Sequence, residues 1–433
     1  MRGVAVGLLG LVLGLLTWAI AMEPSAVPSP EAVDIPAPEG ADHLVCPLTD
    51  FIRSDTQVAL MASRGGSVDL WDVSGGAWAS FGEADLGDTG GWVGEVPSGL
   101  GVLLVESGST GSGAGMTNNA TQAISSWGCG ESSETLMALG GSTLADQRLD
   151  LVLYNPYIWD ASARVEIISE LGEDTPPNLQ EIFVAAGKAV KVSLDEPLRL
   201  RRSLGLRATS SPGKVALLLQ QTGNGDTAMI EGVIPHTDWW LPVPDLGQAE
   251  TYLLMASPSG SSFTYRVDLM TETGLIVGFV EDEYLPGQLI ETRLSEFPDG
   301  VTGIGVSSTV GMVAGLRLEG EGLLAVGPGA RGTSARWFLP GAGDNEERLN
   351  VAWLLNPSGL PVSVSVSGVA EGAFSFNVTI SSESVLPFDL GRLSGLAEDL
   401  PGYLVDADGE IAVVWTSQLD SGAGSYVAGS PVD

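Results

Sequence analysis

The chain has 433 residues, 44% of them hydrophobic, which is enough for two to four domains with buried cores. Acidic side chains outnumber basic ones by 54 to 19, so the formal net charge of −35 argues against nucleic acid or an anionic membrane surface as a partner. The chain has two histidines, His43 and His236, so no imidazole-rich zinc, copper or iron site is predicted.

Residues 1–22 have the features of an export signal. Arg2 supplies the positive start, Gly3 to Ile20 is free of charge, and Ala19-Ile20-Ala21 fits the cleavage pattern. The apolar run is also long enough to span a bilayer, so both a cleaved signal peptide and an uncleaved signal anchor stay open. We expect an exported protein, extracellular or in the cell envelope, which meets a membrane only through this segment if it is uncleaved. Residues 23–45 are proline-rich and predict an extended linker.

Residues 46–130 predict a β module that begins and ends with the cysteines, Cys46 and Cys129. An oxidising compartment permits a disulfide between them, and Trp127 would then cover the sulfur atoms. A catalytic thiol is disfavoured because so few histidines could serve as its base. The Gly-Ser run over 107–115 is expected to be a flexible loop. Four apolar runs predict strands: Gln57–Met61, Ser67–Val73, Trp92–Val96 and Leu100–Val105.

The rest of the chain repeats with a period of about 100 residues, which predicts three further modules over 131–235, 236–333 and 334–433. Each has an apolar strand that ends in a dipeptide with proline, at Asn155-Pro156, Ser257-Pro258 and Asn356-Pro357. A residue before proline is extended and proline cannot donate to a ladder, so these dipeptides end a strand. We therefore expect an all-β fold of tandem immunoglobulin-like β-sandwich modules.

A search for catalytic motifs finds no nucleophile elbow, phosphate-binding loop or zinc-protease motif. Ser211-Pro212-Gly213-Lys214 has a Ser-x-x-Lys spacing, but its Pro-Gly predicts a turn. Asp344 to Glu347 and Asp406 to Glu410 could hold calcium, although Asp408-Gly409 is more typical of a hairpin turn. No catalytic residue, metal site or cofactor is predicted. No spacing singles out a carboxylate pair for glycoside hydrolysis, and such a pair stays possible.

Trp239 and Trp240 are the candidates for ligand contact. Adjacent strand residues face opposite sides, so one ring must point away from its own core, where a sugar ring could stack on it. Trp337-Phe338 at the equivalent place in the next module favours packing at a module boundary instead.

Four motifs together carry a resemblance to a known family: Cys46-Pro47, Trp127 to Cys129, Gly140 to Thr143 and the strand that ends at Asn155-Pro156. With the exported N-terminus, they resemble an actinobacterial family of secreted, envelope-associated proteins described only as a domain of unknown function. The resemblance implies export, an all-β repeat and an envelope setting. It implies no catalytic residue.

These observations predict a non-enzymatic, envelope-associated scaffold or binding protein that presents β-sandwich surfaces to an envelope protein or a cell-wall glycan. The alternative is a carbohydrate-active enzyme, or its accessory carbohydrate-binding protein, because of the tryptophans and acids. A third hypothesis makes the repeats a spacer, in which case the modules would form a rod.

Overall fold

The computed structural model describes residues 43–48, 56–62, 66–72, 79–87, 91–95, 101–106, 112–119, 124–246, 249–340, 348–369, 374–394, 402–419 and 422–432. The predicted export segment, most of the linker and the acidic stretch 344–347 lie outside these residues. Pro38–Asp433 form one compact unit. The fold is almost entirely β, and the predicted all-β sandwich class is confirmed.

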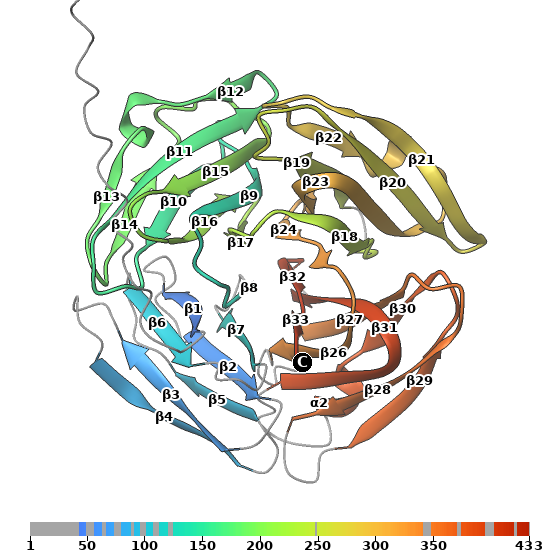
Figure 1. The fold of residues 1–433 in the computed structure, drawn as a ribbon. Coiled ribbons are helices and arrows are strands. Elements are labelled where there is room, and N and C mark those ends of the chain that lie inside the picture. The colour runs from blue at the N-terminus through green and yellow to red at the C-terminus, as the bar shows by residue number, and fades with distance from the viewer. Residues whose placement is uncertain are drawn as a thin grey trace, which may run out of the picture. The chain divides into compact units, whose positions relative to one another are not determined.

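The strands fall into four groups, which we call sandwiches 1 to 4 (Figure 1). Sandwich 1 contains β1 (His43–Leu48), β2 (Thr56–Ala62), β3 (Gly66–Asp72), β4 (Ala79–Gly87), β5 (Gly91–Glu95), β6 (Gly101–Glu106), β7 (Ser112–Asn119) and β8 (Ile124–Gly128). Sandwich 2 contains β9 (Thr135–Gly141), β10 (Arg148–Tyr154), β11 (Ala161–Ser169), β12 (Gly172–Asp174), β13 (Ile182–Val184), β14 (Ala189–Ser193), β15 (Leu204–Ser210), β16 (Ala216–Gly223) and β17 (Asp226–Glu231), with the 3-10 helix η1 (Pro177–Leu179).

Sandwich 3 contains β18 (His236–Pro242), β19 (Glu250–Ala256), β20 (Phe263–Thr271), β21 (Gly274–Tyr284), β22 (Ile290–Arg293), β23 (Val301–Gly320), β24 (Leu323–Pro328) and β25 (Ala330–Arg331), with η2 (Leu294–Glu296). Sandwich 4 contains β26 (Ser334–Pro340), β27 (Arg348–Asn356), β28 (Val362–Gly368), β29 (Ser375–Ile380), β30 (Ser384–Asp389), β31 (Gly402–Leu419), β32 (Gly424–Ala428) and β33 (Ser430–Pro431), with the one-turn helix α2 (Gly391–Ser394).

All four sandwiches share one strand order. Sandwich 1 has the sheets β1-β6-β3-β4 and β5-β2-β7-β8, and sandwich 2 repeats them as β9-β15-β11-β12 and β14-β10-β16-β17. In sandwiches 3 and 4 the sixth and seventh strands merge into the long strands β23 and β31, which belong to both sheets. The N-terminal module, which the sequence pattern does not align with the others, therefore has the topology of the later three.

Each long strand bends where it passes from one sheet to the other. In β31 the register with β26 shifts between Arg336, opposite Asp406, and Ser334, opposite Ile411. Asp408-Gly409 lies at this bend inside β31, so the hairpin turn predicted there is wrong. The turn preference of Asp-Gly is used here to bend a strand that stays paired on both sides of the bend.

The two predicted Asn-Pro turns owe their geometry to a buried amide. Asn155 Nδ2 donates to Trp159 O at 2.6 Å and Val184 O at 3.0 Å, and its Oδ1 accepts from Tyr157 N at 3.0 Å. In sandwich 3, Ser257 Oγ still accepts from the backbone N–H two residues on, at Ser259, at 3.2 Å. Ser257 has no amide group for the other bonds, and its own backbone N–H donates to the hydroxyl of buried Tyr284 at 3.0 Å. The hydroxyl of Tyr284, at the end of β21, thus stabilises the turn that lacks the asparagine amide.

The second half of the Gly-Ser run, residues 112–115, is a strand, so the predicted loop is wrong there. Strand β7 begins at Ser112, and Gly115 is paired with Ala59 on one side and Gly128 on the other. Pairing with strands on both sides outweighs the poor strand propensity of glycine. The four strands predicted in this sandwich are confirmed as β2, β3, β5 and β6 to within a residue or two.

Apolar clusters join each sandwich to two others. One cluster joins Trp127 and the disulfide of sandwich 1 to Tyr154 of sandwich 2. Others join sandwich 2 to sandwich 3 and sandwich 3 to sandwich 4. A fourth joins Met61 of sandwich 1 to Phe338 and Val432 of sandwich 4. The strands β8, β17, β24 and β32, which hold the same position in the four sandwiches, also contact one another in a closed cycle, as β8–β17, β17–β24, β24–β32 and β32–β8. Because sandwich 1 packs on sandwich 4, the linear arrangement expected of a spacer is not found.

Asp226 ties three sandwiches together where these strands meet. Its side chain is buried, and Oδ2 accepts hydrogen bonds from the backbone N–H groups of Leu324 in sandwich 3 and Gly424 in sandwich 4, both at 3.0 Å. Oδ1 accepts from the N–H of Thr227 at 2.8 Å. Desolvation by burial raises the pKa of Asp226 from 3.8 to about 6, although these hydrogen bonds act in the opposite direction.

Asp226 should make stability depend on pH. Because its folded pKa lies above its unfolded value, its contribution is fully present below about pH 4 and is lost as the pH rises through about 6, by on the order of 3 kcal/mol. We expect Asp226→Asn to cost more stability at pH 4 than at pH 7, measured by urea unfolding at both values. A cost that grows with pH would contradict this assignment.

Candidate functional site

A cleft of about 470 Å³ opens in sandwich 3, between the segment that follows β18 and the end of β22 with η2. Its walls combine apolar side chains with polar groups of both charges. They are formed by Val243, Pro244, Asp245, Ala249, Glu250, Thr251, Arg293, Leu294, Ser295 and Val301. The cleft lies within the repeat that departs from the Asn-Pro rule.

An ion pair stands on the wall of this cleft. Glu250 at the start of β19 pairs with Arg293 at the end of β22, and both side chains are about half exposed. Tyr252 OH donates to Glu250 Oε2 at 2.6 Å. The hydrogen bond from Tyr252, followed by that from Arg293, lowers the pKa of Glu250. Glu250 therefore stays ionised near neutral pH, which suits an acceptor of hydrogen bonds and does not suit a general acid.

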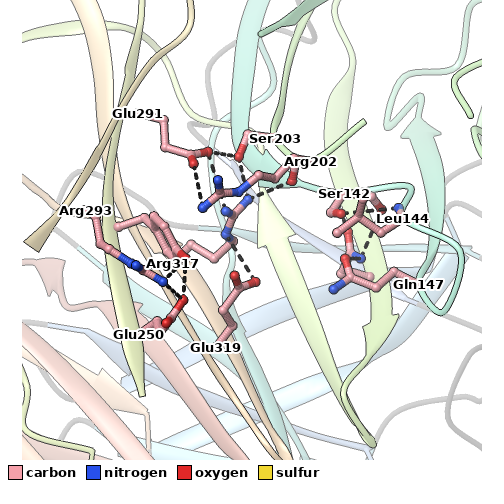
Figure 2. A network of polar contacts seen from close by, with 12 residues as sticks. Ser142, Leu144, Gln147, Arg202, Ser203, Glu250, Glu291, Arg293, Arg317 and Glu319 are labelled. Atoms are coloured by element: carbon pink, nitrogen blue, oxygen red, sulfur yellow. Dashed lines mark hydrogen bonds and ion pairs between the residues drawn. The ribbon is translucent and has the colours of Figure 1, made fainter. Parts of the chain in front are cut away.

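Behind Tyr252, the buried cation Arg317 joins sandwich 3 to sandwich 2 (Figure 2). Its Nη1 donates to the carbonyl of Arg202 at 3.0 Å and to Ser203 Oγ at 2.6 Å. Its Nη2 donates to Glu291 Oε2 at 3.4 Å, and its Nε lies 3.5 Å from Glu319 Oε2. The hydrogen bonds at Nη1 and Nη2 and the two carboxylates offset the cost of removing the charge from water, although the buried Nε makes no hydrogen bond.

Three arginines also surround the ring of Tyr252. The guanidinium carbons of Arg317, Arg202 and Arg293 lie 4.8, 5.0 and 5.6 Å from the ring centroid. Such cation–π contacts add to the ion pairs. Desolvation, followed by the hydrogen bond to Glu250, raises the pKa of Tyr252, so its hydroxyl stays protonated. The cluster borders the cleft through Glu250 and Arg293, which belong to the cleft walls.

Ser203 and Glu291 form the one contact in this cluster that resembles a nucleophile and its base, since Ser203 Oγ donates to Glu291 Oε2. Ser203 is 2% exposed, however, and its oxygen also accepts from Arg317. A nucleophile must reach a substrate and keep its lone pair free. The arrangement therefore holds sandwich 2 to sandwich 3.

The Gly-Gly-Ser-Thr motif positions the segment that receives Arg317. Thr143 N donates to Arg201 O at 2.9 Å, and Arg201 N donates to Thr143 Oγ1 at 3.2 Å. Ser142 is held in turn by the Gln221 amide, which accepts from its N–H at 2.7 Å and donates to its carbonyl at 3.0 Å. The motif thus fixes the backbone at Arg201, and the next residue, Arg202, offers its carbonyl to the buried Arg317.

The tryptophan pair predicted to contact a ligand lies apart from the cleft walls. Trp239 is 1% exposed, and its Nε1 donates to Met312 O at 2.7 Å, at the bend of β23. Trp337 does the same for Ile411 O at the bend of β31. Trp239 is therefore placed as a packing residue. Trp240 is half-buried against the core, with its ring where a Cβ at position 305 would lie, and ligand contact there stays a prediction.

The predicted disulfide between Cys46 and Cys129 is present. Trp127 packs in the same buried cluster, as predicted, and its Nε1 donates to Pro47 O at 3.2 Å. Val45 and Gly130 beside the bridge exchange two backbone hydrogen bonds, so β1 is joined to the segment that follows β8 by these bonds as well as by the disulfide. The bridge is structural.

Sequence reasoning missed Arg317, Asp226 and the cleft. For Arg317 a signal exists, because this cation interrupts the buried run of β23, where an apolar residue is expected. For Asp226 no signal exists, since its partners are backbone N–H groups of two distant strands.

A family model covers residues 104–325, from β6 to β24, and so includes the cleft and the whole Arg317 cluster. Its description is "Family of unknown function", DUF5719. The chain belongs to DUF5719. No curated protein matches this DUF5719 chain in sequence.

Two further observations concern the described part of the DUF5719 chain. No helix in it is long and apolar enough to cross a membrane. Within the same residues, no three histidine, cysteine or acidic side chains gather as a metal site.

Of the residues predicted as calcium candidates, Asp406 pairs with Arg336 at 2.5 Å, and Asp408 Oδ1 accepts a hydrogen bond from Ser363 N at 2.8 Å.

Proposed function

We propose that this chain is an exported, cell-envelope-associated, non-enzymatic binding scaffold. In this proposal the tandem immunoglobulin-like modules of an actinobacterial secreted family present their surfaces to an envelope protein or a cell-wall glycan. The observation that carries the proposal is the open cleft of sandwich 3, which shares Glu250 and Arg293 with the ionic cluster around Tyr252 and Arg317. A preformed cleft with a few polar groups on apolar walls is typical of ligand sites.

The chemistry of the cleft favours binding over catalysis. Asp245, Glu250 and Arg293 supply charged groups, and Thr251 and Ser295 supply hydroxyls, a set suited to the hydroxyl or amide groups of a glycan or peptide. The apolar wall residues can pack against the face of a sugar ring or an aliphatic side chain.

Two carboxylates on one cleft favour a carbohydrate as the second candidate ligand. A glycosidase needs one carboxyl with a raised pKa, and the pKa of Glu250 is lowered. Glu250 does not supply that acid, and we propose the carbohydrate alternative in its accessory-binding form.

Blocking the cleft tests this function. Ser295 is exposed on the cleft wall, so Ser295→Trp should fill the opening without disturbing the core. We expect it to weaken capture of an envelope protein, or of a glycan on an array, by at least about tenfold, or about 1.4 kcal/mol.

Ser262→Trp is the matched control, because Ser262 is exposed in the same sandwich away from the cleft walls. If both variants weaken capture equally, the effect comes from a general disturbance of sandwich 3 and not from blocking the cleft. If neither extracts nor arrays yield a ligand for the mature chain, the proposed function fails.

A further inference from the structure

Strand β21 forms the outer edge of sandwich 3. It has 11 residues, Gly274–Tyr284, and among the described strands it pairs with β20 alone. A strand at a sheet edge presents backbone N–H and C=O groups that can pair with another extended chain. Natural proteins commonly block such edges with short strands, lysine or other charged residues, or bulges. β21 is long and has no lysine, but it carries three acidic residues near its end, and Val277 to Phe279 form a bulge opposite Asp268 alone.

The middle of this edge is apolar and exposed. Val277 is 63% exposed, and Ile276 and Phe279 are 37% and 36% exposed. Gly278 between them has a φ of +63°, and its N–H donates to Asp268 Oδ1 at 2.7 Å. The Phe279 ring packs edge-on against Phe297, with centroids 5.2 Å apart. The ring of Phe279 is thus anchored by Phe297 beside the exposed Val277.

The following part of the same strand is acidic. Glu281, Asp282 and Glu283 are consecutive and exposed, ahead of buried Tyr284. β29, the corresponding edge of sandwich 4, carries exposed Phe376 but no acidic residue over Ser375–Ile380. β21 therefore combines an edge backbone that is regular on either side of a bulge, an apolar centre at the bulge and a negative end.

We propose that β21 is a strand-addition site for a partner protein, which supplies an extended segment with apolar residues against Val277 and Phe279 and basic residues against Glu281–Glu283. Main-chain pairing gives affinity in this mode, and alternate side chains give specificity. The charges favour such a partner over a second copy, because two chains of net charge −35 repel each other. This proposal rests on the binding function above and assigns a protein partner to a different surface.

A synthetic peptide that alternates valine and lysine is the probe, titrated into the full mature chain by fluorescence anisotropy. We expect saturable binding that weakens as salt is added, with amide protection on hydrogen exchange confined to Gly274–Tyr284. Val277→Lys should weaken binding at least tenfold, because it places a cation opposite a cationic peptide. Leu360→Lys, at a site 73% exposed in sandwich 4, should leave binding unchanged.

Four results would overturn the proposal. They are no binding at low salt, equal binding of a valine–glutamate peptide, equal loss with Val277→Lys and Leu360→Lys, and self-association of the chain that Val277→Lys removes. If Val277→Lys leaves envelope capture intact while Ser295→Trp reduces it, the strand-addition site fails and the proposed function stands. If Val277→Lys alone reduces capture, the site stands and the cleft loses its role.

Discussion

Replacing Cys46 and Cys129 by alanine is expected to lower the free energy of unfolding by about 4 kcal/mol. The bridge spans 83 residues, so the loop it closes is long and its loss frees much of the unfolded chain. Both sulfur atoms are buried with Trp127 at the contact with sandwich 2, so packing is lost as well. Urea unfolding of the double variant, followed by tryptophan fluorescence, measures the effect.

The single variants supply the control for this prediction. Either substitution alone removes the same bridge, so the single and double variants should lose similar stability, apart from the small difference in packing. A loss below about 1 kcal/mol in the double variant would show that the Val45–Gly130 hydrogen bonds close sandwich 1 without help from the disulfide.

Arg317→Met should cost about 3–5 kcal/mol, because it leaves Glu291 and Ser203 without their buried cation. The methionine keeps much of the side-chain volume but none of the five donors. The expected lesion is a weakened contact between sandwiches 2 and 3, since the guanidinium donates across it to the carbonyl of Arg202. Thermal unfolding and hydrogen exchange at Leu204–Ser210 would show it.

A surface pair provides the matched control. Arg336 pairs with Asp406 within sandwich 4, with side chains 41% and 38% exposed, so Arg336→Met should cost no more than about 1 kcal/mol. Equal costs for the two variants would mean that Arg317 stabilises only its own strand. If the double variant Arg317→Met/Glu291→Leu is more stable than Arg317→Met alone, the loss is caused by the Glu291 carboxylate left without its cation.

The local sequence pattern predicted those structural features that depend on residues adjacent in sequence. Strand alternation, the proline stops and the two cysteines located most strands, the repeat and the disulfide. The errors are at Ser112–Gly115 and at Asp408-Gly409, where loop and turn preferences were overridden by pairing with strands on both sides.

The contacts between sandwiches could not be predicted, because they join residues one or more repeats apart through groups without a sequence signature. Asp226 binds the backbone N–H of Leu324 and Gly424, which any residue but proline could supply. Gly327 is required because a Cβ there would overlap the Tyr426 carbonyl of sandwich 4. From sequence alone, that glycine is indistinguishable from an ordinary turn residue.

Small-angle X-ray scattering of residues 38–433 tests most directly whether the first and last sandwiches close on each other. The structure predicts a compact particle with a radius of gyration of about 21 Å, from the scaling for compact chains of this length. The Met61→Asp variant, with a charge in the cluster that joins sandwich 1 to sandwich 4, should expand it. A radius well above that value for the unaltered chain, with the scattering decay of a rod, would contradict the closed arrangement.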